Sequence, residues 1–107
     1  EDPNLKIYYY TKSIELKNGI NYSSSYSGRA RAKEKTGDYF GAIEDITYLI
    51  ENFGIGERFW NYETRADIKI RGADFEGACK DYYKALELVS NDDFRKQILN
   101  KINNFCQ

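Results

Sequence analysis

Apolar residues recur at steps of three and four along this chain, which is the spacing of one face of an α-helix. The clearest stretch covers residues 39–53, with apolar side chains at Tyr39, Ala42, Ile43, Ile46, Leu49 and Ile50. Strict alternation of apolar and polar residues, which a half-buried strand needs, does not occur. The pattern therefore predicts helices at about 5–17, 22–36, 39–53, 59–71 and 75–89, with a sixth, amphipathic helix at about 92–105.

The predicted helices belong to an internal repeat. Residues 26–45 align without gaps with residues 62–81, so that Arg29 corresponds to Arg65, 36 positions further on (65 − 29). The same offset matches Tyr26 to Tyr62, Ala30 to Ala66, Lys33 to Lys69, Asp38 to Asp74, Ala42 to Ala78 and Asp45 to Asp81. Applied backwards, it matches Thr11 to Thr47 and Ile14 to Ile50. Each unit thus predicts a pair of helices.

The 107 residues suit a single domain with one modest core or one short stack of helices. We expect a half repeat at about 4–17, full repeats at about 22–53 and 58–89, and a last helix at 92–105. Because the end of a stacked array must cover its apolar face, this last helix is interpreted as a cap. The alternative is that it begins a further repeat. The chain contains no Met and begins with Glu1-Asp2-Pro3, which is typical of a piece of a larger protein.

The repeated residues have two predicted structural roles. Ala30, Ala42, Ala66 and Ala78 are small where helices must cross closely, and the aromatic residues Tyr26, Tyr39, Tyr62 and Phe75 are expected to fill the space between them. Arg29 and Asp45 are separated by the same distance in sequence as Arg65 and Asp81. Because the spacing repeats, we predict one partly buried ion pair within each unit, which sets the register of its two helices.

Charge and composition exclude several classes of function. With 16 basic and 17 acidic side chains the net charge is −1, so no overall field attracts nucleic acid or an anionic membrane. The basic residues of 29–35 divide between two faces of a helix, Arg29 with Lys33 and Arg31 with Lys35. The apolar runs are far shorter than the roughly 20 residues of a membrane span. Neither nucleic acid nor membrane is an expected partner.

Catalytic and cofactor chemistry also lack support in the sequence. There is no His, which removes the usual general base and the His-dependent nucleophilic triads. Gly54-Ile55-Gly56 begins like a dinucleotide-binding loop, yet it lacks the third Gly and follows a helix. Cys79 and Cys106 have no second pair of ligands to hold zinc. We therefore expect no enzyme, no cofactor and no metal site.

The cysteines bear on the compartment as well. Two cysteines, 27 residues apart (106 − 79), are too few and too distant in sequence for a disulfide framework. They are interpreted as free thiols, which are typical of a reducing compartment. The expected location is the cytoplasm, with the periplasm left open.

Three segments together resemble the tetratricopeptide repeat in its common bacterial form. They are Arg29-Ala30-Arg31-Ala32-Lys33, the run Gly37-Asp38-Tyr39-Phe40-Gly41-Ala42-Ile43-Glu44-Asp45, and Lys84-Ala85-Leu86-Glu87-Leu88. The resemblance covers residues 8–88, although each unit is longer than the usual repeat of about 34 residues and the usual Pro between repeats is absent. It implies an all-α fold, namely a right-handed superhelix (α-α solenoid) of antiparallel helix pairs.

The resemblance further implies a scaffold that binds a peptide segment of a partner protein on a concave surface lined by the first helix of each pair. Carried onto this chain, the groove residues are Ser27, Arg31, Glu34, Lys35, Glu63, Asp67, Ile70 and Arg71. Their mixed charge suits a polar peptide with both signs. The competing hypothesis is self-association into a homo-oligomer, because the unpaired first helix is expected to expose an apolar stripe of Ile7, Tyr10 and Ile14.

Overall fold

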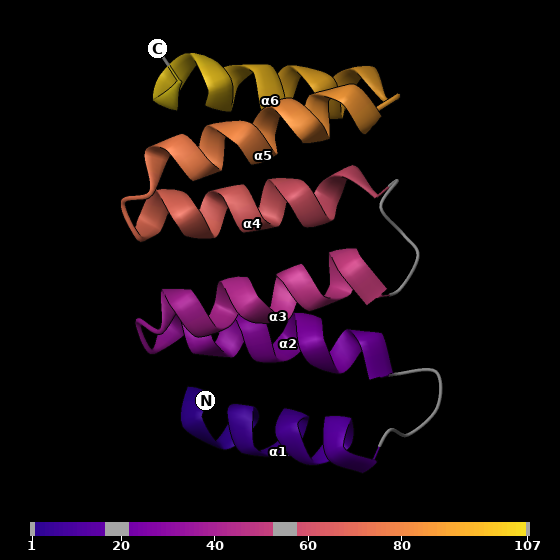
Figure 1. Ribbon diagram of the computed structural model, residues 1–107, viewed down its shortest axis with the longest axis vertical. Helices are drawn as coiled ribbons and strands as arrows, with labels where there is room; N and C mark the ends of the chain where they lie inside the picture. The colour runs from indigo at the N-terminus through magenta and orange to yellow at the C-terminus, as the bar shows by residue number, and fades with distance from the viewer. Residues whose placement is uncertain (1, 17–21, 53–57, 107) are drawn as a thin grey trace.

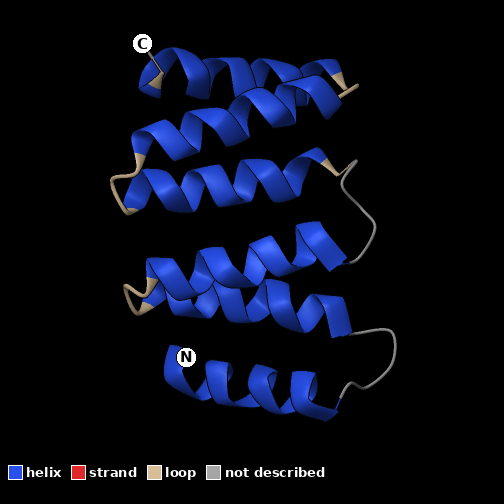
Figure 2. Ribbon diagram, viewed as in Figure 1, coloured by secondary structure: helices blue, strands red, loops and turns tan. Residues whose placement is uncertain are grey.

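The computed structural model describes residues 2–16, 22–52 and 58–106, and this part of the chain forms six α-helices and no strand. Their bounds are α1 Pro3–Leu16, α2 Tyr22–Lys35, α3 Tyr39–Asn52, α4 Phe59–Arg71, α5 Phe75–Leu88 and α6 Asp92–Phe105 (Figures 1 and 2). The predicted all-α fold is confirmed, and the helix ends agree within one residue where they can be compared, except that α1 begins two residues early. Lys17 and Phe53, the expected ends of α1 and α3, lie outside the described residues.

The helices stack in the order in which they follow one another along the chain. Each packs against the next, from α1 on α2 to α5 on α6, and Figure 1 shows this order from the N-terminal to the C-terminal end. The stack measures 41 × 27 × 21 Å. Residues distant in sequence therefore come together only when their helices are near neighbours in the stack.

The core divides into two clusters of buried side chains. The first cluster consists of Tyr26, Ala30, Ala42, Ile46, Leu49 and Ile68. The second consists of Ala66, Ala78, Tyr82, Ala85, Val89, Ile98 and Ile102. The four repeated alanines are at most 1% exposed, as their role at helix crossings predicts. Ile68 of α4 belongs to the first cluster, so the two helix pairs share buried surface rather than meeting only through a loop.

One predicted core residue is on the surface. Phe75 was expected to fill the space beside its alanines, but its side chain is 49% exposed. Its repeat equivalent Tyr39 is half-buried and lies against Gly72 at the end of α4. Phe75 has no following helix pair to cover it within the described residues. The position is therefore buried only where another unit stacks on it.

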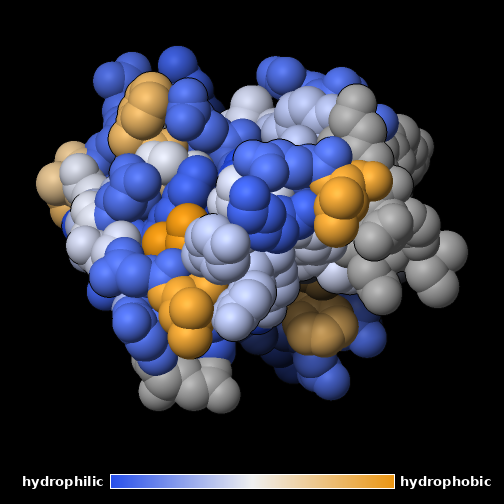
Figure 3. All heavy atoms as spheres, turned by 90° about the horizontal axis from the view of Figure 1, so that it is seen from below, coloured by the Kyte–Doolittle hydropathy of each residue, from blue (hydrophilic) through white to orange (hydrophobic). Residues whose placement is uncertain are grey.

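The first helix packs differently from the prediction. Ile7, Tyr10 and Ile14, expected as an exposed stripe, are half-buried against α2: the ring of Tyr10 occupies the space that a Cβ on Gly28 would need, and Ile14 contacts the first core cluster. The outward side chains of α1 are instead Leu5, Tyr8, Tyr9 and Leu16, which are 51–68% exposed. Figure 3 views the molecule from the α1 end and shows hydrophobic residues as separate patches among hydrophilic ones.

The two helix pairs turn in the same way. Gly37 follows α2 with φ of 86°, and Ala73, at the same repeat position after α4, has φ of 66°. The next residue caps the following helix, since the Asp38 carboxylate accepts from Gly41 N at 2.9 Å and the Asp74 carboxylate from Gly77 N at 3.0 Å. The repeat therefore conserves a left-handed residue followed by an Asp cap.

Ala73→Gly should raise the free energy of unfolding by about 0.5–1 kcal/mol, because a left-handed conformation strains any residue with a Cβ. Gly37→Ala is the matched reverse change and should lower it by about 1 kcal/mol, since open space surrounds Gly37 and only its φ matters. Urea unfolding of both variants measures the difference. If both substitutions changed the free energy of unfolding equally and in the same direction, the left-handed backbone at these two positions would not explain their effects.

The last helix is attached by several kinds of contact. Ile98 and Ile102 are buried in the second core cluster, and Arg95 Nη2 donates to the carbonyl of Val89 at 2.9 Å. The Asn91 side chain accepts from Phe94 N at 2.9 Å and caps the helix. These contacts attach α6 to the second helix pair, and its interpretation as a cap rather than the start of a further repeat stays a prediction.

The prediction of free thiols is wrong. Cys79 and Cys106 form a disulfide, with their Cα atoms 5.8 Å apart. Cys79 lies near the start of α5 and Cys106 directly follows α6, and a short turn joins the two helices so that they run side by side in opposite directions. Separation in sequence is therefore no guide to separation in space.

None of the helices described is long and apolar enough to cross a membrane.

Candidate functional site

A polar cluster lies between the helices of the first pair. Arg29 donates from Nε and Nη2 to the two carboxylate oxygens of Asp45, at 2.9 and 2.8 Å, and from Nη1 to Thr11 of α1 at 3.2 Å. Lys33 Nζ lies 3.4 Å from Asp45, whose side chain is almost fully buried. One carboxylate thus neutralises two cations from α2, and the Arg also ties α1 to the pair.

The second helix pair repeats this cluster. Arg65 binds Asp81 through the same two nitrogens at 2.8 and 2.7 Å and donates to Thr47 at 3.0 Å. Lys69 Nζ lies 3.0 Å from Asp81. Both predicted Arg–Asp pairs are therefore present. Sequence reasoning did not identify the Lys and Thr residues as partners of these pairs. Their matches at the same offset of 36 were the signal that could have identified them.

These clusters are structural. The hydrogen bond to the carboxylate raises the pKa of each Arg above its ordinary value, while burial alone would lower it. Bidentate pairing uses both oxygens of the Asp, so Asp45 and Asp81 have little capacity left for a ligand. The clusters fix the register within each pair and leave the surface of α2 and α4 to carry any site.

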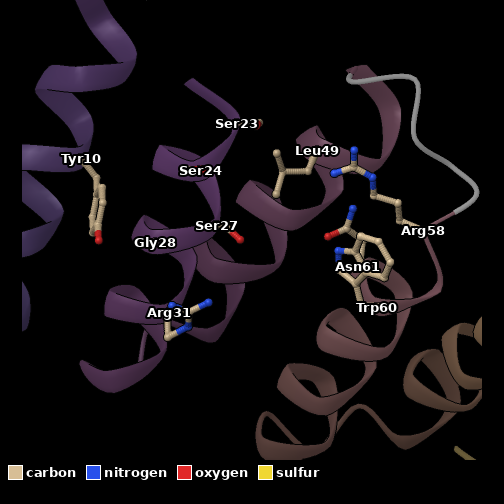
Figure 4. A pocket seen from close by; sticks show the side chains of 10 residues that line it. All are labelled: Tyr10, Ser23, Ser24, Ser27, Gly28, Arg31, Leu49, Arg58, Trp60 and Asn61. Carbon is tan, nitrogen blue, oxygen red and sulfur yellow. The ribbon is translucent and has the colours of Figure 1, made fainter. Parts of the chain in front are cut away.

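A polar recess on that surface lies between α1, α2 and α4, with Leu49 of α3 also lining it, and has a volume of about 410 Å³. We call it the α2–α4 hollow, and its lining residues are Tyr10, Ser23, Ser24, Ser27, Gly28, Arg31, Leu49, Arg58, Trp60 and Asn61 (Figure 4). A smaller recess of about 140 Å³ continues it along the two helices and shares Ser27, Arg31, Trp60 and Asn61 with it. Together they form a continuous groove between the first helices of the two pairs.

Three of the four sequence-predicted groove residues of α2 lie along this groove. Ser27 and Arg31 line the hollow, and Glu34 lines the smaller recess. Lys35 lines a further small recess with Arg31 at the α1 side. Arg71 of α4 reaches across to pair with Glu34, so these two groove candidates neutralise each other and tie the first helices together.

One groove candidate of α4, Glu63, is wrong because α6 covers it, and a second, Asp67, binds α6 but stays partly exposed. Glu63 is only 7% exposed and accepts from Gln97 and Lys101 of α6, both at 2.8 Å. Asp67 accepts from Lys101 at 3.1 Å and from the hydroxyl of Tyr82 at 2.6 Å. Both carboxylates bind α6, and Asp67 also lines the recess beside it, so the place of Asp67 in the groove stays a prediction. Ile70 packs against the second core cluster and also lines a recess beside α6, so its place in the groove stays a prediction.

The charges at this helix contact are coupled. Burial would lower the pKa of Lys101, but its hydrogen bonds to Glu63 and Asp67 outweigh that effect and raise it. Burial, assisted by the bond to Asp67, also raises the pKa of Tyr82 well above its ordinary value. At neutral pH the ammonium is charged and the phenol is neutral, so each carboxylate has a donor.

Lys101→Ala should lower the free energy of unfolding by about 2 kcal/mol, because it leaves two largely covered carboxylates without their cation. Lys96→Ala, on the exposed side of the same helix, is the control and should change it by less than about 0.5 kcal/mol. Chemical unfolding of the two variants measures both values. Equal small effects would show that the contact contributes nothing measurable.

Sequence reasoning missed eight of the ten lining residues, and four of them, Tyr10, Arg58, Trp60 and Asn61, come from outside α2 and α3. Arg58 lies over the ring of Trp60, 5.5 Å from its centroid, and Asn61 is buried beside them. They come from α1 and from the start of α4, and no repeated motif marks them. The single Trp of the chain was the only signal in the sequence.

The chemistry that this arrangement offers is recognition of a polar ligand. In the described part of the chain no group of three or more Cys, Asp or Glu side chains could hold a metal ion. The hollow presents hydroxyl groups, an amide, two guanidinium groups and one aromatic face. No family model and no curated protein matches this sequence.

Proposed function

We propose that the chain is a non-catalytic scaffold that binds a peptide segment of a partner protein in the α2–α4 hollow. The observation that carries the proposal is the hollow itself, which lies between the first helices of two repeated helix pairs and is lined mainly by polar groups. Its volume falls in the range of about 300–1,000 Å³ that is typical of ligand sites.

The lining suits a peptide. Ser23, Ser24, Ser27 and Asn61 can donate to and accept from the amide groups of an extended backbone. Trp60, which is 49% exposed, offers an apolar face for one side chain of the ligand. A site that combines polar groups for the backbone with one aromatic anchor favours a short segment over a large flat surface.

The repeat supports an arrangement of the tetratricopeptide type as part of this proposal. The two units share their caps, their left-handed turn residues and their ion-pair clusters at the same offset of 36. Identical pairs stacked in one direction generate a superhelix, and the right-handed form is the one that this repeat implies. First helices would then line its concave side, and the hollow, which lies between the first helices of the two pairs, would open onto that side.

Panning a phage library of random dodecapeptides against the protein tests the function. We expect peptides that bind the native chain and lose binding to Ser27→Trp, which fills the hollow with an indole ring. Glu87→Trp places the same ring on an exposed position of α5 and should leave binding unchanged. Failure to enrich any peptide, or equal binding to both variants, would contradict a peptide site in the hollow.

The disulfide changes the expected compartment. The cytoplasmic expectation rested on free thiols, and Cys79 and Cys106 are paired. Structural disulfides form and persist in oxidising compartments. We therefore propose an oxidising location, such as the periplasm or the outside of the cell, over the cytoplasm.

A second candidate function is self-association through α1. The outward side chains Leu5, Tyr8, Tyr9 and Leu16 are more than half exposed and follow one side of the helix, where a second copy could pack. Sedimentation velocity over a wide concentration range tests it, with Tyr9→Glu as the disrupting variant. A native protein that sediments as a monomer at every concentration excludes this alternative.

A further inference from the structure

We infer that the segment held in the α2–α4 hollow is acidic, with Asp or Glu side chains that bind Arg31 and Arg58. This inference rests on the proposed function and specifies the ligand of the same site. Its basis is an imbalance of charge, because the hollow has two guanidinium groups and none of its lining residues within the described ranges is acidic.

Most other cations near the groove already have a carboxylate partner. Arg29 and Lys33 share Asp45, and Arg65 and Lys69 share Asp81. In addition, Arg71 pairs with Glu34 and Lys101 pairs with Glu63. Arg31 is exposed and forms no ion pair with the described residues. It is therefore a cation whose natural partner, a carboxylate, the described part of the chain does not supply.

The second cation of the hollow, Arg58, is held in place by an aromatic ring. Its guanidinium lies over the Trp60 ring, 5.5 Å from the centroid, and this contact orients the group, which forms no ion pair with the residues that the structure describes. A guanidinium fixed in this way loses less conformational freedom when it binds a carboxylate with two parallel hydrogen bonds. Figure 4 shows Arg58 and Arg31 at different parts of the hollow, which suits two acidic side chains on one segment.

The cationic character continues toward α1. A small recess next to the hollow is lined by Lys6, Arg31 and Lys35 together with the ring of Tyr10, and it too lacks an acidic lining residue. Further along α4, Glu63 and Asp67 are neutralised by Lys101. The acidic side chains of the segment should therefore lie near Arg31 and near Arg58 at the start of α4, and not beside Glu63 and Asp67.

A peptide fits these observations better than a nucleic acid. The cations gather at one hollow of about 410 Å³ and do not form a track along the molecule, and the whole chain has a net charge of −1. Binding of a phosphate backbone needs several cations spaced along its length. Ser and Asn side chains between the two Arg residues also match the amide groups of a peptide.

The test uses the random dodecapeptide library on the native, disulfide-bonded protein. The enriched peptides should contain more Asp and Glu than the starting library, and their affinity should fall as salt concentration rises. The Arg31→Glu/Arg58→Glu variant should bind them about tenfold or more weakly, as measured by fluorescence anisotropy. The control Lys84→Glu/Lys96→Glu has the same change of net charge on other exposed positions and should bind as the native protein does.

Each outcome has a defined meaning. Enriched peptides without an excess of Asp and Glu, or with equal affinity for the Arg31/Arg58 variant, overturn this inference and leave the peptide-binding function standing. No enriched peptide overturns both. A fluorescein-labelled oligothymidylate that binds more tightly than the acidic peptides overturns the assignment to a peptide. Circular dichroism spectra that match the native protein ensure that the variants are folded.

Discussion

Asp81→Ala should lower the free energy of unfolding by about 3 kcal/mol, the largest effect that we expect from a single substitution. Asp81 is nearly buried and neutralises Arg65 and Lys69, whose side chains are also mostly covered. Removing one member of a buried ion pair leaves its partners charged in a poorly solvated place, at a cost of roughly 3–5 kcal/mol. The partial exposure of the two cations places the expected value at the lower end.

Urea denaturation followed by circular dichroism measures this change in the free energy of unfolding. Because the cluster is repeated, the same experiment can be made on the first helix pair. Asp45→Ala removes the equivalent carboxylate from the first helix pair and should cost a similar amount. Glu44→Ala, an exposed neighbour on the same helix, is the control and should change the stability by less than about 0.5 kcal/mol. Two unchanged unfolding midpoints for the Asp variants would show that the clusters do not stabilise the helix pairs.

Reduction of the Cys79–Cys106 disulfide should lower the free energy of unfolding by about 3 kcal/mol. The bond closes a loop across a sequence separation of 27 residues. In the chain-entropy account, a loop of this length restricts the unfolded state by roughly 3–4 kcal/mol. A small domain has a total of only about 5–15 kcal/mol, so the reduced protein should unfold at a much lower urea concentration.

The double variant Cys79→Ser/Cys106→Ser separates the bond from side effects of the reductant. It should unfold as the reduced native protein does, and dithiothreitol should not change it further. Mass spectrometry of the unreduced native protein, unfolded and treated with a thiol-alkylating reagent, checks the bond directly. Addition of two alkyl groups under oxidising conditions would show that the cysteines are free.

Reduction should affect the two ends of the molecule unequally. The disulfide ties the end of α6 to α5, whereas the α2–α4 hollow is lined by residues of α1 to α4 and of the segment just before α4. The remaining contacts of α6, through Ile98, Ile102 and Lys101, do not depend on the bond. Amide hydrogen exchange should therefore increase first in α6.

Much of the local structure followed from the sequence, because it depends on residues close together in the chain or on their repetition. The recurrence of apolar residues every three or four positions determined where the helices lie. The offset of 36 identified the Arg29–Asp45 and Arg65–Asp81 pairs, since a contact required once by the packing of two helices is required again in the next copy. The buried alanines are predictable for the same reason.

Only the tertiary structure decided the features that join different units. Cys79 meets Cys106 because α6 folds back along α5, and α6 also covers Glu63 and binds Asp67, which the family resemblance had placed on an open groove. The hollow gathers Tyr10 and Arg58 from segments 48 residues apart (58 − 10). Neither the period nor the local spacing specifies how a last, unrepeated helix docks, because that depends on the shape and charge of surfaces distant in sequence.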